Sequence, residues 1–140
     1  MFAAMNISTS ALVAQRLRLN AIANNIANVS TTHNEAGEAV PYQPRFTVFQ
    51  TDDTIRGPLG AAGVKVASVE TSTAEPRMKY EPGHPDAIQD GPMKGYVAYP
   101  NVNMMVEFTD ALEATRAYEA NIGVLEIAKD MTQQSLRIVA

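Results

Sequence analysis

The side chains of this sequence that could do acid–base or metal chemistry are few. His84 stands two residues before Asp86 in a turn-forming Pro-Gly-His-Pro-Asp sequence, and His33 is the only other histidine. A His–Asp pair can ligate a metal, but two histidines without any cysteine leave a transition-metal site short of ligands. The adjacent carboxylates Asp52 and Asp53 suggest a general acid and base, although such neighbours in a polar loop are ordinarily solvated. We therefore expect no metal, no cofactor and no catalytic site.

Composition and motifs exclude further classes. No nucleophile elbow, phosphate-binding loop or dinucleotide fingerprint is present. The net charge of −4 argues against nucleic acid as a partner, because phosphate binding needs a basic surface. No apolar run approaches the roughly 18 residues of a membrane span, and the first residues lack the basic and apolar regions of a cleaved signal peptide. With 140 residues, 46% of them hydrophobic, we expect one folded unit of ordinary size.

Helix-breaking residues divide the chain into three parts. All eight prolines lie in residues 41–100, and seven of the eight glycines lie in residues 37–95. Proline costs a helix interior about 3 kcal/mol and glycine about 1 kcal/mol relative to alanine, so both ends can be helical and the middle cannot. The sequence predicts an α+β fold in which helical segments 1–30 and 102–140 pair as an antiparallel coiled coil, with a small β-rich domain (31–101) inserted between them.

Both terminal segments carry apolar residues at helical spacing. In the first segment, helical over about residues 6–29, the heptad stripe starts at Met5 and continues with Leu12, Leu19, Ile22, Ile26 and Val29, with the polar Ser8 and Gln15 at the remaining positions. In residues 102–138 the stripe is Met104, Phe108, Ala111, Thr115, Tyr118, Ile122 and Leu125. Such helices would be about 35 and 55 Å long, so we expect them to pair and to stand out from the middle domain. The first carries Arg16 and Arg18 without any acid, and the last carries six acids against three bases, which is compatible with pairing.

Pairing of the two helices with each other would leave some of their apolar side chains uncovered. These are Leu17, Ala21, Ala23, Ala27, Met105, Leu112 and Ile127. They indicate an interface with other subunits, unless the middle domain covers them. That domain has three expected strands, at residues 45–50, 63–69 and 95–99, separated by turn sequences at 56–60 and 81–86.

An asparagine cluster marks the end of the first helix. Asn20, Asn24 and Asn28 share one helical face and Asn25 lies beside it. Because asparagine is a mediocre helix former, the cluster calls for a reason. It is either a solvated face near a frayed helix end, or a set of buried amides that fixes the register between packed helices. Gly123 also has two possible explanations. It is either a glycine that a long helix tolerates, or the site of a close helix approach or a bend.

Two stretches resemble the bacterial flagellar rod and hook family. Residues 21–31, Ala-Ile-Ala-Asn-Asn-Ile-Ala-Asn-Val-Ser-Thr, are similar to its N-terminal signature, and residues 113–121, Glu-Ala-Thr-Arg-Ala-Tyr-Glu-Ala-Asn, to its other terminal helix. Within the family, the short length and the segments 80–87 and 95–102 resemble a small proximal-rod member. The resemblance covers nearly the whole chain and is weakest at residues 1–7 and 51–62.

The resemblance implies a structural, non-enzymatic role. The chain would polymerise helically through its terminal helices into the proximal rod of the motor drive shaft, which crosses the periplasm. Its partners would be copies of itself, other proximal and distal rod subunits, and the flagellar type III export apparatus, which exports subunits without a cleaved signal. The alternatives are another small rod-family subunit or a soluble helical adaptor. We also expect the helix pair to be poorly ordered in the monomer and to fold on assembly.

The residues expected at the assembly interface lie on the two terminal helices and share their apolar or asparagine-rich faces. They are Leu12, Leu19, Asn20, Ile22, Asn24, Asn25, Ile26, Asn28, Met104, Phe108, Ala111, Leu112, Thr115, Arg116, Tyr118, Asn121, Ile122 and Leu125.

Overall fold

The computed structural model describes residues 2–139. Two long helices, α1 (Phe2–Ala27) and α2 (Met104–Val139), run antiparallel from the two ends of the chain. Between them the chain forms two antiparallel hairpins. The first consists of β1 (Arg45–Arg56) and β2 (Ala62–Thr71), joined through a short 3-10 turn (Pro58–Gly60), and the second of β3 (Arg77–Tyr80) and β4 (Tyr96–Tyr99). The predicted α+β class, with two paired terminal helices and a β-rich middle, is confirmed.

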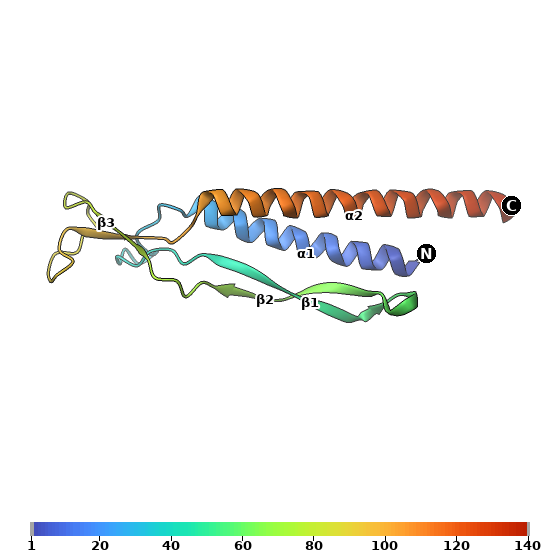
Figure 1. Ribbon diagram of the computed structural model, residues 1–140, viewed down its shortest axis with the longest axis horizontal. Coiled ribbons are helices and arrows are strands. Elements are labelled where there is room, and N and C mark those ends of the chain that lie inside the picture. Colours follow the sequence, from blue (N-terminus) through green and yellow to red (C-terminus); the bar gives the residue numbers. More distant parts are fainter. Residues whose placement is uncertain (1, 140) are drawn as a thin grey trace.

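Helix α1 lies in the middle of the molecule. It contacts α2 on one side and both strands of the β1–β2 hairpin on the other (Figure 1). The expectation that the helix pair stands out from the middle domain is therefore wrong for α1. Small residues allow this approach: Ala14 and Ala21 are buried, so Ala21 is not surplus surface. The Ser10 hydroxyl also accepts a 3.0 Å hydrogen bond from the Val64 N–H of β2.

The β1–β2 hairpin is longer than predicted. Its pairing begins at Arg45 with Thr71, includes Asp52 with Gly63, and ends at Arg56 with Ala62. Gly63 suits the crowded site where the hairpin meets α1, because an added Cβ would lie 3.0 Å from the Ser10 Oγ atom and 3.0 Å from the Ile55 Cβ atom. The strands expected at 45–50 and 63–69 are confirmed. β1 extends towards the turn, and β2 extends mainly at its other end, where Glu70 and Thr71 pair with the start of β1.

The second hairpin lies far from the two chain termini (Figure 1). The predicted strand at 95–99 is confirmed as β4, and it pairs with β3 from Arg77–Tyr99 to Tyr80–Tyr96. Strand β3 was missed because it has only four residues, all of them exposed, and its Arg-Met-Lys-Tyr alternation is too short to indicate a strand. Val97 is fully buried here, and Pro100 and Val102 are buried close by in the chain. The middle of the chain is thus two separate hairpins and not one sheet.

The helix boundaries follow local capping. Asn103 caps α2, since its side-chain Oδ1 accepts a 3.1 Å hydrogen bond from the Met105 N–H. Helix α2 therefore begins two residues later than predicted. Helix α1 already begins at Phe2, ahead of the 6–29 stretch in which the helical spacing was found.

The contact between α1 and α2 is made by smaller residues than predicted. On α2 the buried side chains are Ala114 and Ala128. Met104, Phe108 and Ile122 of the predicted stripe are all more than a third exposed, as is Thr115. Alanine lets two helices approach closely, so the larger apolar residues flank the contact. On α1 the polar positions of the heptad lie inside: Ser8 is buried, and the buried Oε1 atom of Gln15 has no hydrogen-bond partner among the described residues.

The helices are unequal in length. Helix α1 has 26 residues and α2 has 36, which corresponds to about 39 and 54 Å at 1.5 Å per residue. The C-terminal end of α2 therefore runs past the N-terminal end of α1 (Figure 1). Within residues 2–139, neither helix contains a stretch long and apolar enough to cross a lipid bilayer.

The packing predicts a gradient of amide exchange in the purified monomer. Backbone amides of α1 should exchange slowly, because α1 is covered on two sides, and those of residues 133–138 should exchange fastest, because their side chains are all exposed and α2 runs past the N-terminal end of α1 (Figure 1). Hydrogen–deuterium exchange with peptide-level mass spectrometry measures this directly. Uniformly fast exchange in both helices would contradict the gradient and would favour helices that order only on assembly.

Candidate assembly interface

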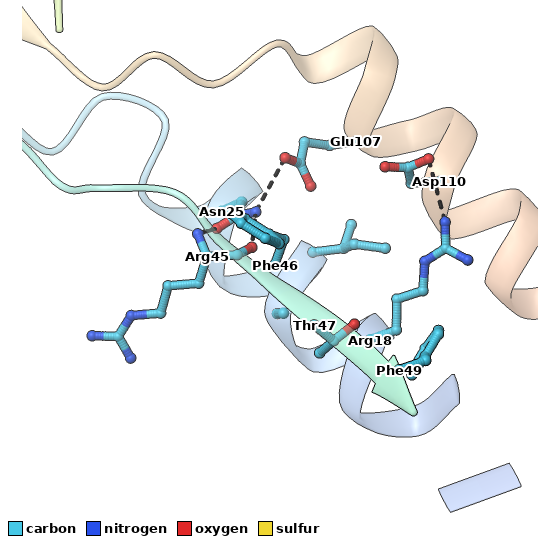
Figure 2. Close-up of a pocket in the computed structure, with 10 residues that line it drawn as sticks. Arg18, Asn25, Arg45, Phe46, Thr47, Phe49, Glu107 and Asp110 are labelled. Carbon is cyan, nitrogen blue, oxygen red and sulfur yellow. Dashed lines mark hydrogen bonds and ion pairs between the residues drawn. The ribbon is translucent and has the colours of Figure 1, made fainter. Parts of the chain in front are cut away.

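A single buried asparagine joins three parts of the fold. Asn25, near the end of α1, is only 3% exposed. Its Nδ2 donates to the Arg45 carbonyl at 2.8 Å and to the Glu107 Oε1 atom of α2 at 3.1 Å. Its Oδ1 accepts from the Arg45 N–H at 2.8 Å and from the Tyr42 hydroxyl at 3.0 Å. Figure 2 shows Asn25 between the start of β1 and Glu107. Both donors and both lone pairs of the amide are therefore used.

The other asparagines of the cluster behave differently. Asn20 and Asn24 are exposed in the single chain. Asn28 stabilises the end of α1, because its Nδ2 donates to the Asn24 carbonyl at 2.9 Å and its Oδ1 accepts from the Thr31 hydroxyl at 3.1 Å. Of the two explanations for the asparagine cluster, a solvated helix face is the one that fits Asn20 and Asn24 within one chain. The buried, register-defining amide is Asn25, which lies off that face. The sequence alone offered no signal that would single it out.

Ion pairs add to the contact between the helices. Arg18 Nη2 lies 3.5 Å from Asp110 Oδ1 and 3.2 Å from Glu113 Oε2. This confirms the expected charge match between a basic α1 and an acidic α2. Because both carboxylates are substantially exposed, each pair contributes at most about 1 kcal/mol. Arg18 therefore helps to orient α2 more than it stabilises the fold.

Burial perturbs two groups around Asn25. Desolvation raises the pKa of the Glu107 carboxyl, and the nearby Asp110 charge adds to the increase, while the hydrogen bond from Asn25 opposes it. Desolvation also raises the pKa of the Tyr42 hydroxyl. At neutral pH a charged Glu107 is consequently held in an unfavourable environment.

A second polar cluster ties the segment after α1 to the loop between β3 and β4. The Thr32 hydroxyl donates to Asp86 Oδ2 at 2.5 Å, and His33 Nδ1 lies 3.4 Å from the same oxygen. The Asp86 N–H donates to His84 Nδ1 at 3.1 Å. The Thr32 hydrogen bond, and after it His33, holds the pKa of the Asp86 carboxyl below its ordinary value. Sequence reasoning paired His84 with Asp86 but missed His33, which is 53 positions from Asp86 in the chain.

This cluster of Thr32, His33, His84 and Asp86 has a structural role, which is to hold two loops together. Within residues 2–139, no group of three or more histidine, cysteine, aspartate or glutamate side chains is arranged to hold a metal ion. Its oxygen and nitrogen atoms are engaged with one another across two loops, which is what a tie between segments requires.

An open groove lies where α2 and β1 both rest on α1. Its volume is about 320 Å³, and Figure 2 shows the side chains that line it. Ala21 and Ile22 come from α1, Phe46 and Phe49 from β1, and Glu107 and Asp110 from α2. Phe46 and Phe49 are both more than a third exposed. The groove mixes apolar and charged groups and holds no arrangement of nucleophile and base.

Several large apolar side chains of α2 are exposed in the single chain. Met105 is 75% exposed, Leu112 61% and Ile127 63%. All three were expected to stay uncovered after the two helices pair, and all three are exposed in the single chain. Exposed apolar side chains of this size are what contact with another molecule would cover, and such contact stays a prediction for α2.

The predicted interface residues divide into two groups. Those already buried or half-buried within the chain are Leu12, Leu19, Ile22, Asn25, Ile26, Asn28, Ala111, Tyr118, Asn121 and Leu125. Those exposed and free to meet another subunit are Asn20, Asn24, Met104, Phe108, Leu112, Thr115, Arg116 and Ile122. An assembly role for either group stays a prediction.

Replacing Asn25 by aspartate should destabilise the protein strongly. The change removes two donated hydrogen bonds and places a second carboxylate against Glu107, so we expect a loss of about 2–4 kcal/mol. Urea unfolding followed by circular dichroism measures it. The same substitution at exposed Asn24 is the matched control and should cost under about 1 kcal/mol. Equal losses at the two positions would contradict the role of Asn25.

Replacing Glu107 by glutamine should stabilise the protein at neutral pH. A pKa raised by folding means that the favourable, protonated state is lost as pH rises through the folded pKa. Glutamine keeps the carbonyl that accepts from Asn25 and never carries charge. The gain in Tm should therefore be largest at pH 7 and should shrink as pH falls towards 4.5, the ordinary value of glutamate. Thermal unfolding from pH 4 to 8 tests this, with Glu119→Gln as the exposed control. A gain independent of pH would refute it.

Comparison with known protein families places both ends of the chain. The family model described as "Flagella basal body rod protein" matches residues 5–33, which cover most of α1 and the segment after it. The model described as "Flagellar basal body rod FlgEFG protein C-terminal" matches residues 93–138, which include β4 and nearly all of α2. The two matches coincide with the two helices that pack together.

Individual relatives match almost end to end. The flagellar basal-body rod protein FlgC of Borreliella burgdorferi is 39% identical, over 99% of this chain and 97% of its own length. FlgC of Salmonella typhimurium is 41% identical, over 95% and 93% of the two chains. FlgC of Bacillus subtilis is 34% identical, over 98% and 97%. With two matched helices and full-length similarity, the chain belongs to the FlgC family of flagellar basal-body rod proteins.

Proposed function

We propose that this protein is a structural subunit of the proximal rod of the bacterial flagellar basal body and polymerises through its terminal helices. Its relatives are named basal-body rod proteins, and their similarity extends over nearly the whole chain. The family consists of rod components and not enzymes, so the alternative of another activity has no support. The alternative of a different small rod subunit is disfavoured by the consistent match to FlgC.

The observation that carries the proposal is the uncovered apolar surface of α2. Met105, Leu112 and Ile127 lie exposed on a helix whose other side is already occupied by α1. A soluble monomer would gain nothing from this surface, whereas a subunit of an assembly would bury it. A helical rod needs contacts between two different surfaces of each subunit, because such contacts do not close after two copies.

The remaining features of the proposal follow from the family. Neighbouring copies and other rod subunits, proximal and distal, would cover the exposed side of α2. The subunit would leave the cytoplasm through the flagellar type III export apparatus without a cleaved signal and would take its place in the rod within the periplasm. A soluble helical adaptor is the second candidate, and it differs by forming a complex of fixed stoichiometry.

A point substitution can separate assembly from folding. Leu112→Glu puts a charge into the proposed contact at an exposed site, so the Tm of the purified protein should change little. Cells carrying it in place of the native gene should lose swimming, and the chain should be missing from isolated basal bodies. Leu112→Met keeps the apolar surface and is the control that should swim normally.

Two results would overturn this proposal. One is normal swimming and normal basal bodies in cells that lack the chain altogether. The other is recovery of the epitope-tagged native chain only in a discrete soluble complex of fixed stoichiometry, as an adaptor requires.

A further inference from the structure

Helix α2 carries a second heptad seam that the single chain leaves open. Alternating steps of three and four residues, the spacing of a coiled-coil seam, connect its members. They are Ala117, Ala120, Val124, Ile127, Met131 and, one heptad on, Ile138. Val124 is 46% exposed, Ile127 63% and Met131 53%. The seam is distinct from the side of α2 that buries Ala114 against α1, and distinct from the stripe predicted from Met104 to Leu125.

An open apolar depression lies along this second seam. An apolar hollow of about 300 Å³ is lined by Val124, Ile127, Ala128 and Met131 of α2 and by Ala4 of α1. No charged or polar side chain lines it. Ala128 is also buried in the contact between α1 and α2, so the hollow continues directly from the established helix pair. Side chains from a third helix lying along α2 would pack into it in the way that knobs pack into holes.

Helix α1 carries a complementary seam on its outer side. Val13, Leu17, Asn20, Asn24 and Ala27 follow the same alternation of four and three residues. All five are exposed, because α2 and the hairpin cover the other sides of α1. The side-chain amides of Asn20 and Asn24 make no hydrogen bond among the described residues. Two apolar residues followed by two asparagines suit a contact whose register is set by polar groups.

Charge favours a match between these two seams on different copies. Helix α1 has two arginines and no acid. Arg18 is engaged with α2 of its own chain, and Arg16 is exposed without an ion pair among residues 2–139. Helix α2 has six acids and three bases, and the ion pairs of Arg18 with Asp110 and Glu113 offset only part of this excess negative charge. Arg16 of one copy is therefore available to acids such as Asp130 on α2 of another.

We propose that the second seam of α2 receives the outer seam of α1 from a second copy of this chain. The inference rests on the proposed rod function and names the surface that mediates it. Each α2 would then lie between its own α1 and a neighbour's α1. Since the two seams differ, each copy offers one of each, and the contact repeats without closing. In this contact the exposed Asn20 and Asn24 would fix the register of the intermolecular helix pair.

Disulfide trapping tests the contact. Because the sequence contains no cysteine, every disulfide of this chain must involve an introduced cysteine. Two differently tagged copies, one with Leu17→Cys and one with Ile127→Cys, replace the native gene together. Isolated basal bodies are then oxidised. The expected result is a species with both tags at the mass of two chains, since a disulfide forms only when Cα atoms approach within about 7 Å. Because the exact register is open, Val13, Leu17 and Asn20 are each tested against Val124, Ile127 and Met131. Thr73→Cys, exposed between the hairpins, replaces the α1 cysteine as the control and should give no such species.

Other outcomes overturn the inference in distinguishable ways. Crosslinking of Ile127→Cys with itself, and not with α1 positions, would show that two α2 helices pair symmetrically. Disulfides formed only with a cysteine of another basal-body protein would show that a different subunit fills the seam. No crosslink at any of the pairs, with both tags present in basal bodies, would sink the inference and leave the rod function standing. Absence of the tagged native chain from basal bodies would instead remove the proposed function itself.

Discussion

The position of α1 between α2 and the β1–β2 hairpin is the constraint on which the rest of the structure depends. Small side chains such as Ala14 and Ala21 let two elements approach one helix from different sides. Asn25 then links all three, because its amide bonds the backbone of β1 and the carboxylate of Glu107 at once. A buried amide with all its hydrogen bonds made permits one register, and any sliding of α1 would leave polar groups unpaired.

The same arrangement leaves α2 only partly covered. It is ten residues longer than α1, and its main tertiary contact is with α1. Alanines occupy that contact, so the larger apolar side chains lie beside it and outside it. A chain of this size cannot bury a helix of about 54 Å along several sides. The uncovered surface is thus a direct consequence of helix length, and it is where the assembly proposals begin.

Much of the architecture was predictable from the confinement of proline and glycine to residues 37–100, Gly123 excepted. That pattern predicts two terminal helices and an irregular middle because helix breakers act locally. Three strands were predictable because short runs rich in apolar and β-branched residues lie between turn sequences. The exposed strand β3 was not, because its pairing with β4 depends on a partner that lies beyond a loop. Gly123 shows no bend and no neighbour that a Cβ would meet, so within one chain it is a tolerated glycine.

The sequence by itself determined helix position, the absence of recognisable catalytic motifs, the charge match of α1 with α2 and the family resemblance, since each resides in local composition or in linear motifs. Only the tertiary structure decided which side of each helix is buried. It replaced the predicted stripe at Met104 and Phe108 by one centred on Ala114, and it made Asn25 the buried asparagine in place of the Asn20 and Asn24 face. The physical reason is that several sides of a helix can carry apolar spacing at once. Which side is used depends on how closely a partner can approach, and linear sequence does not encode that distance.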